Sequence, residues 1–171
     1  MNQTDSPDRV NSVTGLYAQP LLETLLTHEV ARAKRYPVPL ALIRLAIKVP
    51  PNWKAGTAES AAVAIASVLN SNLRVADVPG HYENDFLIIL PVTDEAGGVK
   101  VASRLMALLS AGQMAPDGGK LALDICIGLT AIPEESIIPS DAFLSQATAA
   151  LTEARRRGAR AVVRYSELPA S

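Results

Sequence analysis

Short apolar runs alternate with helical segments along the whole chain, and this alternation constrains the fold more than any other feature. The spacing of apolar residues predicts four helices, at residues 20–36, 57–73, 94–112 and 140–158. Length and composition predict five strands, at residues 39–47, 75–82, 85–90, 120–132 and 159–165. The second and third strands are separated by a short turn, which predicts a hairpin. The order indicates an α/β (α+β) fold in which a mixed central sheet of about five strands carries helices on both faces.

Length and composition indicate a single globular domain. The chain has 171 residues, of which 49% are hydrophobic, so a packed core is expected. Because 16 Lys and Arg residues stand against 17 Asp and Glu residues, there is no basic excess and we expect no nucleic-acid binding. The single cysteine, Cys126, lies in an apolar run and is expected to be a buried thiol, which fits a reducing compartment.

The ends of the chain and its hydropathy bear on localisation. Residues 1–10 are polar and are expected to form a flexible N-terminal tail, and residues 167–171 a C-terminal tail. No apolar run approaches the ~20 residues of a membrane span, and the N-terminus has no signal-peptide pattern. We therefore expect a cytoplasmic protein without membrane insertion.

Five stretches of the sequence, in register along the chain, resemble the GGDEF domain of diguanylate cyclases. They are "NSVTGLY", "HEVARAKRYPVPLALIRLAI", "RVADVPGHYENDFLIILPVT", "ICIGLTA" and "QATAALTEARRRGARAVVRY". The resemblance implies the nucleotidyl-cyclase-like fold for residues 11–166. It also implies the chemistry of that family, in which two GTP molecules held by a dimer condense to cyclic di-GMP, a bacterial second messenger. Such phosphoryl transfer depends on Mg²⁺ held by carboxylates.

The residues that such a cyclase requires are replaced in the first predicted strand. When the family is aligned on "PLALIRLAI", its metal-binding Asp falls at Ala46 and the second Asp falls at Lys48. A methyl group cannot bind a metal ion, and a lysine would repel one. The resemblance leaves only Asn52 as a distant candidate for a guanine-recognising residue.

The turn that names the family is shortened and has lost its glycines. Between Tyr82 and Phe86 stand Glu83, Asn84 and Asp85, one residue fewer than Gly-Gly-Asp-Glu. We expect Asn84 to take the left-handed backbone conformation, which Asn tolerates. Asn84 also corresponds best to the metal ligand, as a neutral amide, and Asp85 to the second acidic residue. The resemblance therefore implies a degenerate, catalytically inactive domain with no catalytic residues, no metal and no cofactor.

Upstream of this turn, the inhibitory site (I-site) of the family is retained. Arg74 and Asp77 form the motif Arg-x-x-Asp at the family's spacing from the turn, and Arg104 falls at the position of the second arginine. An arginine can bind guanine O6 and N7 or a phosphate, and a carboxylate can accept hydrogen bonds from guanine N1–H and the exocyclic amine. The resemblance thus implies a cyclic di-GMP receptor with Arg74, Asp77 and Arg104 as ligand-binding residues.

Other interpretations of the same residues stay open. An Arg and an Asp three residues apart often form a solvated surface pair, in which case the fold would be a scaffold for protein–protein interaction without nucleotide. Residual cyclase activity is a third hypothesis. Since 171 residues leave no room for a sensor, receiver or phosphodiesterase domain, we expect a homodimer or a signalling partner protein, or else that the sequence is a piece of a longer protein.

Three further polar features have weaker interpretations. His28 is expected to be solvated on the first helix, and His81 to lie on a strand surface without a metal partner. The basic cluster at residues 153–160 ends a predicted helix, where cations favour the helix dipole. Within it, Arg155 falls at the position of a lysine that contacts phosphate in the family.

Overall fold

The computed structural model describes residues 9–48, 57–114, 120–121, 123–133, 138–158 and 160–169, with the backbone alone at 57–58, 113–114 and 120–121. Asn52 and residues 1–8 of the expected N-terminal tail lie outside this part of the chain. The elements are, in order, α1 (Gln19–Arg35), β1 (Leu40–Lys48), α2 (Thr57–Asn72), β2 (Val78–Tyr82), β3 (Asp85–Pro91), α3 (Glu95–Ser110), β4 (Gln113–Met114), β5 (Lys120–Leu121), β6 (Asp124–Ile132), α4 (Ser140–Arg157), β7 (Val162–Arg164) and the 3₁₀ turn η1 (Tyr165–Glu167).

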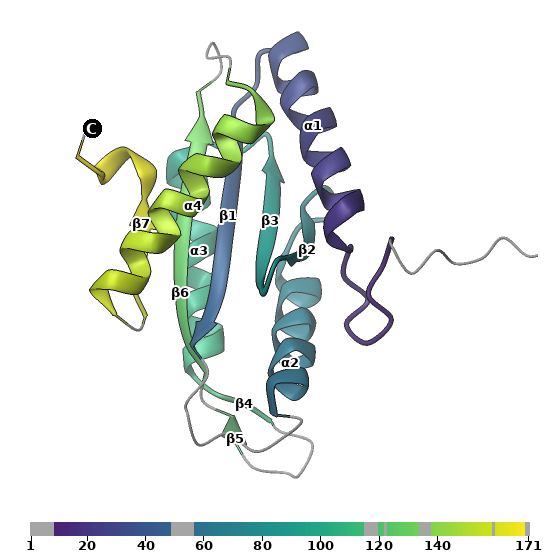
Figure 1. Cartoon of the computed structure of the whole chain (residues 1–171), viewed down its shortest axis with the longest axis vertical. Helices are drawn as coiled ribbons and strands as arrows, with labels where there is room; N and C mark the ends of the chain where they lie inside the picture. The colour runs from purple at the N-terminus through teal and green to yellow at the C-terminus, as the bar shows by residue number, and fades with distance from the viewer. Residues whose placement is uncertain are drawn as a thin grey trace, which may run out of the picture.

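A five-stranded mixed sheet with helices on both faces forms the body of the molecule, which confirms the predicted fold class (Figure 1). The strand order is β2-β3-β1-β6-β7, and only the β6–β7 pair is parallel. β1 therefore lies at the centre of the sheet, between β3 and β6. Its pairing with β3 ends at Leu45, opposite Phe86, whereas its pairing with β6 continues to Lys48.

Alternate side chains of β1 enter different layers of the molecule. Ala41, Ile43 and Leu45 pack in the core beneath α2 and α3, whereas Leu40 and Leu42 pack beneath α1 and α4. Figure 1 shows α4 and α3 on opposite sides of β1 and β6. This period of two is what a strand buried on both faces requires. Arg44 continues the second series, so its side chain points toward the α1 and α4 layer.

A close approach between α4 and the sheet depends on Gly128 in β6. A Cβ atom at this position would lie 2.1 Å from the backbone nitrogen of Leu151 in α4. No rearrangement of side chains could relieve a clash with backbone. Gly128 therefore lets α4 lie directly on β6, and this contact brings the C-terminal part of α4 beside the end of β1.

Three predicted strands differ from the observed ones, and the last of them, expected at 159–165, spans only Val162–Arg164 as β7. The strand expected at 75–82 begins only at Val78, because the residues before it form a turn closed by a hydrogen bond from Asp77 N to Arg74 O of 3.0 Å. The strand expected at 120–132 is divided into β5 and β6. β5 pairs with β4 in a separate two-stranded sheet, whereas β6 joins the main sheet.

Short segments at both ends of the described chain are tied to the sheet. Val10 bridges to Tyr17, and Tyr17 bridges in parallel to Gly80 in β2. After β7, the chain turns through η1, and Leu168 packs against the cluster under the end of α4. None of the described helices combines the length and hydropathy needed to cross a membrane.

Candidate functional site

The Arg74–Asp77 turn is held together by its own side chains. The Asp77 carboxylate accepts a hydrogen bond from the backbone nitrogen of Arg74, at 2.8 Å to Oδ2. The Arg74 guanidinium donates to the same carboxylate, from Nη2 to Oδ1 at 3.1 Å and from Nε to Oδ2 at 3.5 Å. The Asp77 side chain is 1% exposed and that of Arg74 is 57% exposed. The carboxylate is thus inside the protein and the guanidinium covers it.

The Arg74 side chain is also fixed by the loop that follows β3. Its Nη2 donates to the carbonyl oxygen of Pro91 at 2.9 Å and to Thr93 Oγ1 at 2.7 Å. Thr93 is buried, and its hydroxyl donates in turn to the Pro91 carbonyl at 3.0 Å. These contacts hold the guanidinium against the sheet at the end of β3.

The three residues predicted as a ligand site line one hollow, which has a volume of about 370 Å³. Arg74 and Asp77 come from the turn before β2, and Arg104 comes from α3. Arg104 is exposed and donates from Nη2 to the Asn72 carbonyl at 2.7 Å, at the C-terminal end of α2. The hollow is completed by Pro39, Val92, Thr93, Asp94, Gly97 and Val101. The structure therefore brings together residues that are 30 positions apart in the sequence.

The rim of this hollow contains a strained backbone position. Val92 has φ of 51°, in the left-handed region that a β-branched residue rarely adopts, and its side chain is exposed. It connects the last residue of β3 to Thr93, whose backbone nitrogen donates to Pro39 O at 3.2 Å. The strain is thus located between two anchored residues.

At the opposite end of β3, the expected conformation of the shortened turn was wrong in one respect. Glu83 takes the left-handed conformation, with φ of 52°, and Asn84 does not have a positive φ. Tyr82 and Asp85 pair directly, so Glu83 and Asn84 form a two-residue hairpin loop. The turn types favoured in such loops require positive φ at the first central residue, which is Glu83. The Glu83 backbone nitrogen donates to Gln19 Oε1 of α1 at 2.7 Å.

Two arginines bind the carboxylate of Asp85. Arg44 of β1 donates from Nη2 to Oδ2 at 2.9 Å, and Arg155 of α4 donates from Nη2 to Oδ2 at 2.8 Å and to Oδ1 at 3.0 Å. The side chains of Asp85 and Arg44 are 8% and 3% exposed. Arg44 Nη2 also lies 3.4 Å from Oε2 of Glu83. The acidic groups of the turn therefore face guanidinium groups.

Arg44 is further enclosed by groups on α4 and β2. Its Nη1 donates to Thr148 Oγ1 at 3.0 Å, and its guanidinium carbon lies 4.8 Å from the centre of the Tyr82 ring. Its Nε is buried and has no hydrogen-bond partner among the described residues. Burial also raises the pKa of Tyr82, and the nearby Glu23 and Glu83 carboxylates add to this rise. The cluster is thus closed to solvent on the Arg44 side.

Arg44 was not predicted from the sequence as a site residue, although it lies two residues before Ala46, one of the two positions proposed for lost metal ligands. Ala46 and Lys48 extend past the last β1–β3 pair and lie opposite Cys126 and Asp124 of β6. The β1 side chain that reaches the turn is that of Arg44. A charged residue inside an apolar strand was the available signal, since a buried charge requires a partner.

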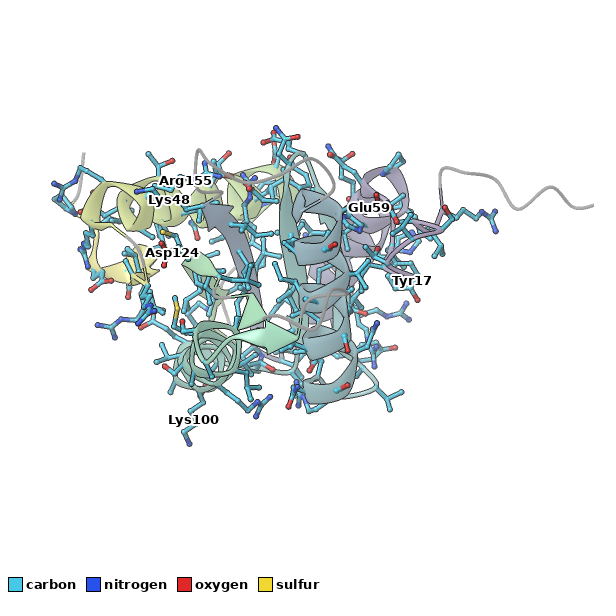
Figure 2. All side chains as sticks on the ribbon, turned by 90° about the horizontal axis from the view of Figure 1, so that it is seen from below. Tyr17, Lys48, Glu59, Lys100, Asp124 and Arg155 are labelled. Carbon is cyan, nitrogen blue, oxygen red and sulfur yellow. The ribbon has the colours of Figure 1, made fainter. Side chains whose placement is uncertain are left out.

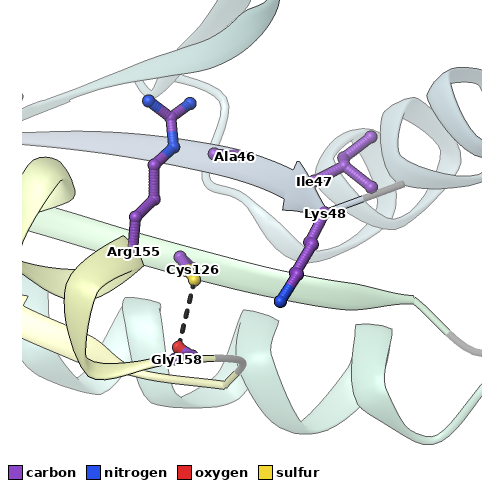
Figure 3. Close-up of a pocket in the computed structure, with 6 residues that line it drawn as sticks. All are labelled: Ala46, Ile47, Lys48, Cys126, Arg155 and Gly158. Atoms are coloured by element: carbon purple, nitrogen blue, oxygen red, sulfur yellow. Dashed lines mark hydrogen bonds between the residues drawn. The ribbon is translucent and has the colours of Figure 1, made fainter. Parts of the chain in front are cut away.

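Ala46 and Lys48 line a second hollow, of about 480 Å³, together with Ile47, Cys126, Arg155 and Gly158 (Figure 3). As expected, Cys126 is a buried thiol, and its Sγ donates to the Gly158 carbonyl at 3.3 Å. Lys48 and Arg155 both line this hollow, and their labels lie side by side in Figure 2. Within the part of the chain that the structure describes, no three His, Cys, Asp or Glu side chains gather in a way that could hold a metal ion.

The two histidines have different surroundings. His28 is exposed on α1, as expected. His81 is half-buried instead of lying on an open strand surface. Its Nε2 shares a hydrogen bond of 2.6 Å with Thr14 Oγ1, and its ring packs against Phe86 with the centroids 5.1 Å apart. This burial lowers the pKa of His81 below its ordinary value of 6.5.

The sheet order, the hairpin between β2 and β3 and the polar cluster at its turn define a domain of the nucleotidyl-cyclase-like α/β class. Residues 9–161 match the family model described as "Diguanylate cyclase, GGDEF domain", so the chain belongs to the GGDEF family. No curated protein matches the chain.

Solved structures of GGDEF domains share its fold at low sequence identity. The GGDEF domain of DgcB from Caulobacter crescentus in complex with c-di-GMP has a TM-score of 0.86 at 16% identity, covering 98% of this chain and 100% of that one. The GGDEF domain of TpbB (YfiN) from Pseudomonas aeruginosa has a TM-score of 0.83 at 20% identity, covering 92% and 94%. Diguanylate cyclase SiaD of P. aeruginosa, in complex with its activator SiaC, has a TM-score of 0.82 at 24% identity, covering 91% and 61%.

Proposed function

We propose that this GGDEF domain is a cyclic di-GMP receptor that does not synthesise the nucleotide. The observation that carries the proposal is the convergence of Arg74, Asp77 and Arg104 on one hollow of about 370 Å³. Two guanidinium groups at one hollow suit a ligand that combines phosphates with guanine bases. The GGDEF domain of DgcB was solved in complex with c-di-GMP, which supports this choice of ligand for a family member.

The charge arrangement at the Glu83–Asp85 turn argues against cyclase activity. Two-metal and one-metal phosphoryl transfer both need carboxylates that are free to bind the cation. Asp85 is bonded to Arg44 and Arg155, so a divalent cation would have to displace two guanidinium groups. Asn84 offers only a neutral amide. This set of residues does not fit magnesium, and we derive no catalytic step through it.

We expect the bound state to be read out by dimerisation or by a partner protein. SiaD was solved with its activator SiaC, an example of a GGDEF protein that is contacted by another chain. Ligand binding at the hollow would fix the Arg74 turn relative to the N-terminal part of α3. A second copy of the chain or a partner protein would then contact a changed surface.

Isothermal titration calorimetry with cyclic di-GMP tests the receptor function. We expect saturable binding that Arg104→Ala weakens by about tenfold or more, because this variant removes an exposed cation without disturbing a buried group. Arg74→Ala should abolish binding, and its thermal melting has to be measured alongside because Asp77 would lose its partner. Arg32→Ala on α1, another exposed arginine, is the matched control.

Two results would contradict the proposal in different ways. Absence of heat up to high micromolar cyclic di-GMP would remove the receptor function, and a partner captured equally with and without nucleotide would then favour the scaffold hypothesis. Conversion of GTP to cyclic di-GMP with Mg²⁺ or Mn²⁺ would show residual cyclase activity.

A further inference from the structure

We infer that a groove between the N-terminal hairpin, residues 9–18, and the C-terminal end of α2 docks a partner protein through a segment that carries an apolar side chain and a carboxylate. The groove has a volume of about 430 Å³. It shares Arg74 and Asp77 with the hollow proposed for cyclic di-GMP, but its other lining residues are different. Docking in the groove is a separate property and does not depend on nucleotide binding.

The N-terminal hairpin forms a fixed wall of the groove. Val10 bridges to Tyr17, and Tyr17 bridges in turn to Gly80 of β2. A Cβ atom at Gly80 would lie 2.9 Å from the carbonyl oxygen of Tyr17, so this close approach requires glycine. The same carbonyl accepts a hydrogen bond from His81 N at 2.8 Å, and Asn11 Oδ1 accepts from two backbone nitrogens of the hairpin loop. The wall is therefore present before any partner binds, which lowers the ordering cost of docking.

Apolar side chains form both the floor and the rim of the groove. On the floor, Leu16 and Leu69 are buried and Leu73 is partly buried against the same core. On the rim, Val10 is half-exposed and Val75 is fully exposed.

Exposed apolar side chains also gather around this groove. Eight large apolar side chains are exposed in the part of the chain that the structure describes, and four of them lie on the hairpin or on the Arg74 turn: Val10, Val13, Tyr17 and Val75. Figure 1 shows the hairpin, in purple, beside α2 and β2. Single exposed valines need no explanation, but a group of them around a groove marks a protein interaction site.

The charge at the groove indicates what kind of partner fits. Arg74 is 57% exposed, and its Nη1 donates to none of the described residues. Asp77, the other charged residue among the described residues that line the groove, has a side chain that is only 1% exposed. Arg9, next to Val10, is exposed as well. The groove therefore presents positive charge to a partner.

This charge favours an acidic partner over a second copy of the chain. In a twofold dimer the same patch faces itself, so the two copies of Arg74 would meet across the interface and repel each other. A carboxylate on a different protein would instead form a charge-assisted hydrogen bond with the exposed guanidinium. The apolar side chain beside it would fill the space between Leu73 and Val75.

A random library of displayed peptides of about 12 residues, enough for three helical turns, is the probe for this groove. The library is selected on immobilised wild-type protein, with soluble Val75→Asp protein present to remove peptides that bind elsewhere. We expect the retained peptides to combine leucine, isoleucine or an aromatic residue with aspartate or glutamate. No enrichment, or enrichment of basic peptides, would overturn the inference.

The most enriched peptide is then titrated by calorimetry in the absence of nucleotide. Val75 is fully exposed, so Val75→Asp should fold normally and should weaken the peptide by about tenfold or more, because it places a carboxylate where the peptide brings its own. Val63→Asp is the matched control: Val63 is an exposed valine of α2 that does not line the groove, and the affinity should change by less than about threefold.

The peptide itself supplies a second control. Replacing its carboxylate by the amide should weaken binding to the wild type by about tenfold, because the pair with Arg74 is lost. Equal affinity of wild type and Val75→Asp for the peptide, or equal affinity of the wild type for the acid and amide peptides, would overturn the inference. Failure of cyclic di-GMP to bind would refute the proposed function and would leave these measurements unchanged.

Discussion

The two ends of β3 each carry an arginine–carboxylate cluster, and the two clusters differ in whether a buried arginine takes part. At Asp85 the arginine of β1, Arg44, is buried with the carboxylate, and a second arginine completes the bonds. At Asp77 the carboxylate is buried and the arginine faces solvent. Arg44 is 3% exposed and cannot reach a ligand, whereas Arg155, at 54%, is almost as exposed as Arg74. The comparison teaches that a carboxylate held by a buried arginine forms a structural ion pair, whereas a carboxylate covered by an exposed arginine alone can belong to a binding site.

The backbone supports the same comparison. Each end of β3 has a residue other than glycine in the left-handed region, Glu83 before the strand and Val92 after it. The positive φ of Glu83 is required by the two-residue hairpin loop, whereas Val92 lies in the loop that leads to α3. The strain at Val92 therefore has a different origin, and it lies at the rim of the accessible cluster.

Replacing the buried arginine is expected to have the largest effect on stability. Arg44→Ala would leave Asp85 with Arg155 alone and would remove the contacts to Thr148, so we expect a loss of about 3 kcal/mol in the free energy of unfolding. Arg74→Ala should cost less, about 1–2 kcal/mol, because the backbone nitrogen of residue 74 still donates to Asp77.

Urea unfolding followed by circular dichroism measures both losses. Arg32→Ala is the control, since Arg32 is exposed and its ion pair with Glu29 is long, at 3.7 Å; its effect should stay below about 0.5 kcal/mol. A larger loss for Arg74→Ala than for Arg44→Ala would reverse the comparison between the two clusters.

Relief of backbone strain gives a smaller, stabilising effect. Val92→Gly should raise the free energy of unfolding by about 0.5–1 kcal/mol, because glycine adopts positive φ without a Cβ penalty and the Val92 side chain buries little surface. Glu83→Gly should gain less, since it also loses the contact between Glu83 and Arg44. Thermal unfolding of both variants beside the wild type checks this order, and destabilisation by Val92→Gly would contradict it.

The smallest expected effect concerns the pH dependence of stability. It arises at His81 in β2, the strand that leads into the Glu83–Asp85 turn. Burial lowers the pKa of His81, so between that lowered value and about 6.5 the unfolded chain binds more protons than the folded one. The contribution of His81 to stability is therefore present above about pH 6.5 and is lost as the pH falls. Relative to His81→Gln, which can still bond to Thr14, the wild type should lose stability from about pH 7.5 to about pH 5.5. A difference in the free energy of unfolding between the two proteins that stays constant over this pH range would refute this contribution of His81.

Much of the fold followed from the sequence because its signals are local. The periods of two and 3.6 residues located β1, β3 and the four long helices to within a few residues, and the short hairpin was placed correctly. The limits of β2 and β5 were among those missed. They depend on a hydrogen bond across the Arg74 turn and on pairing with β4, neither of which changes the pattern of apolar residues.

The candidate sites show the same division. Counting along the chain was enough to nominate Arg74, Asp77 and Arg104, and the fold does bring them to one hollow. The pattern did not indicate that Asp77 is covered by Arg74, nor that Arg44 binds Asp85 of the turn. Both facts depend on the register between strands and on how side chains fill the space left by their neighbours.

The sequence by itself determined the family, the order of the elements and the residues that stand between Tyr82 and Phe86, because these are properties of residue identity and spacing. The tertiary structure alone decided which charges meet and which remain accessible. Two arginines from β1 and α4 converge on Asp85 only because β3, β1 and α4 pack together. Exposure of Arg74 and Arg104 likewise depends on the packing of a loop beside α3, which no local pattern encodes.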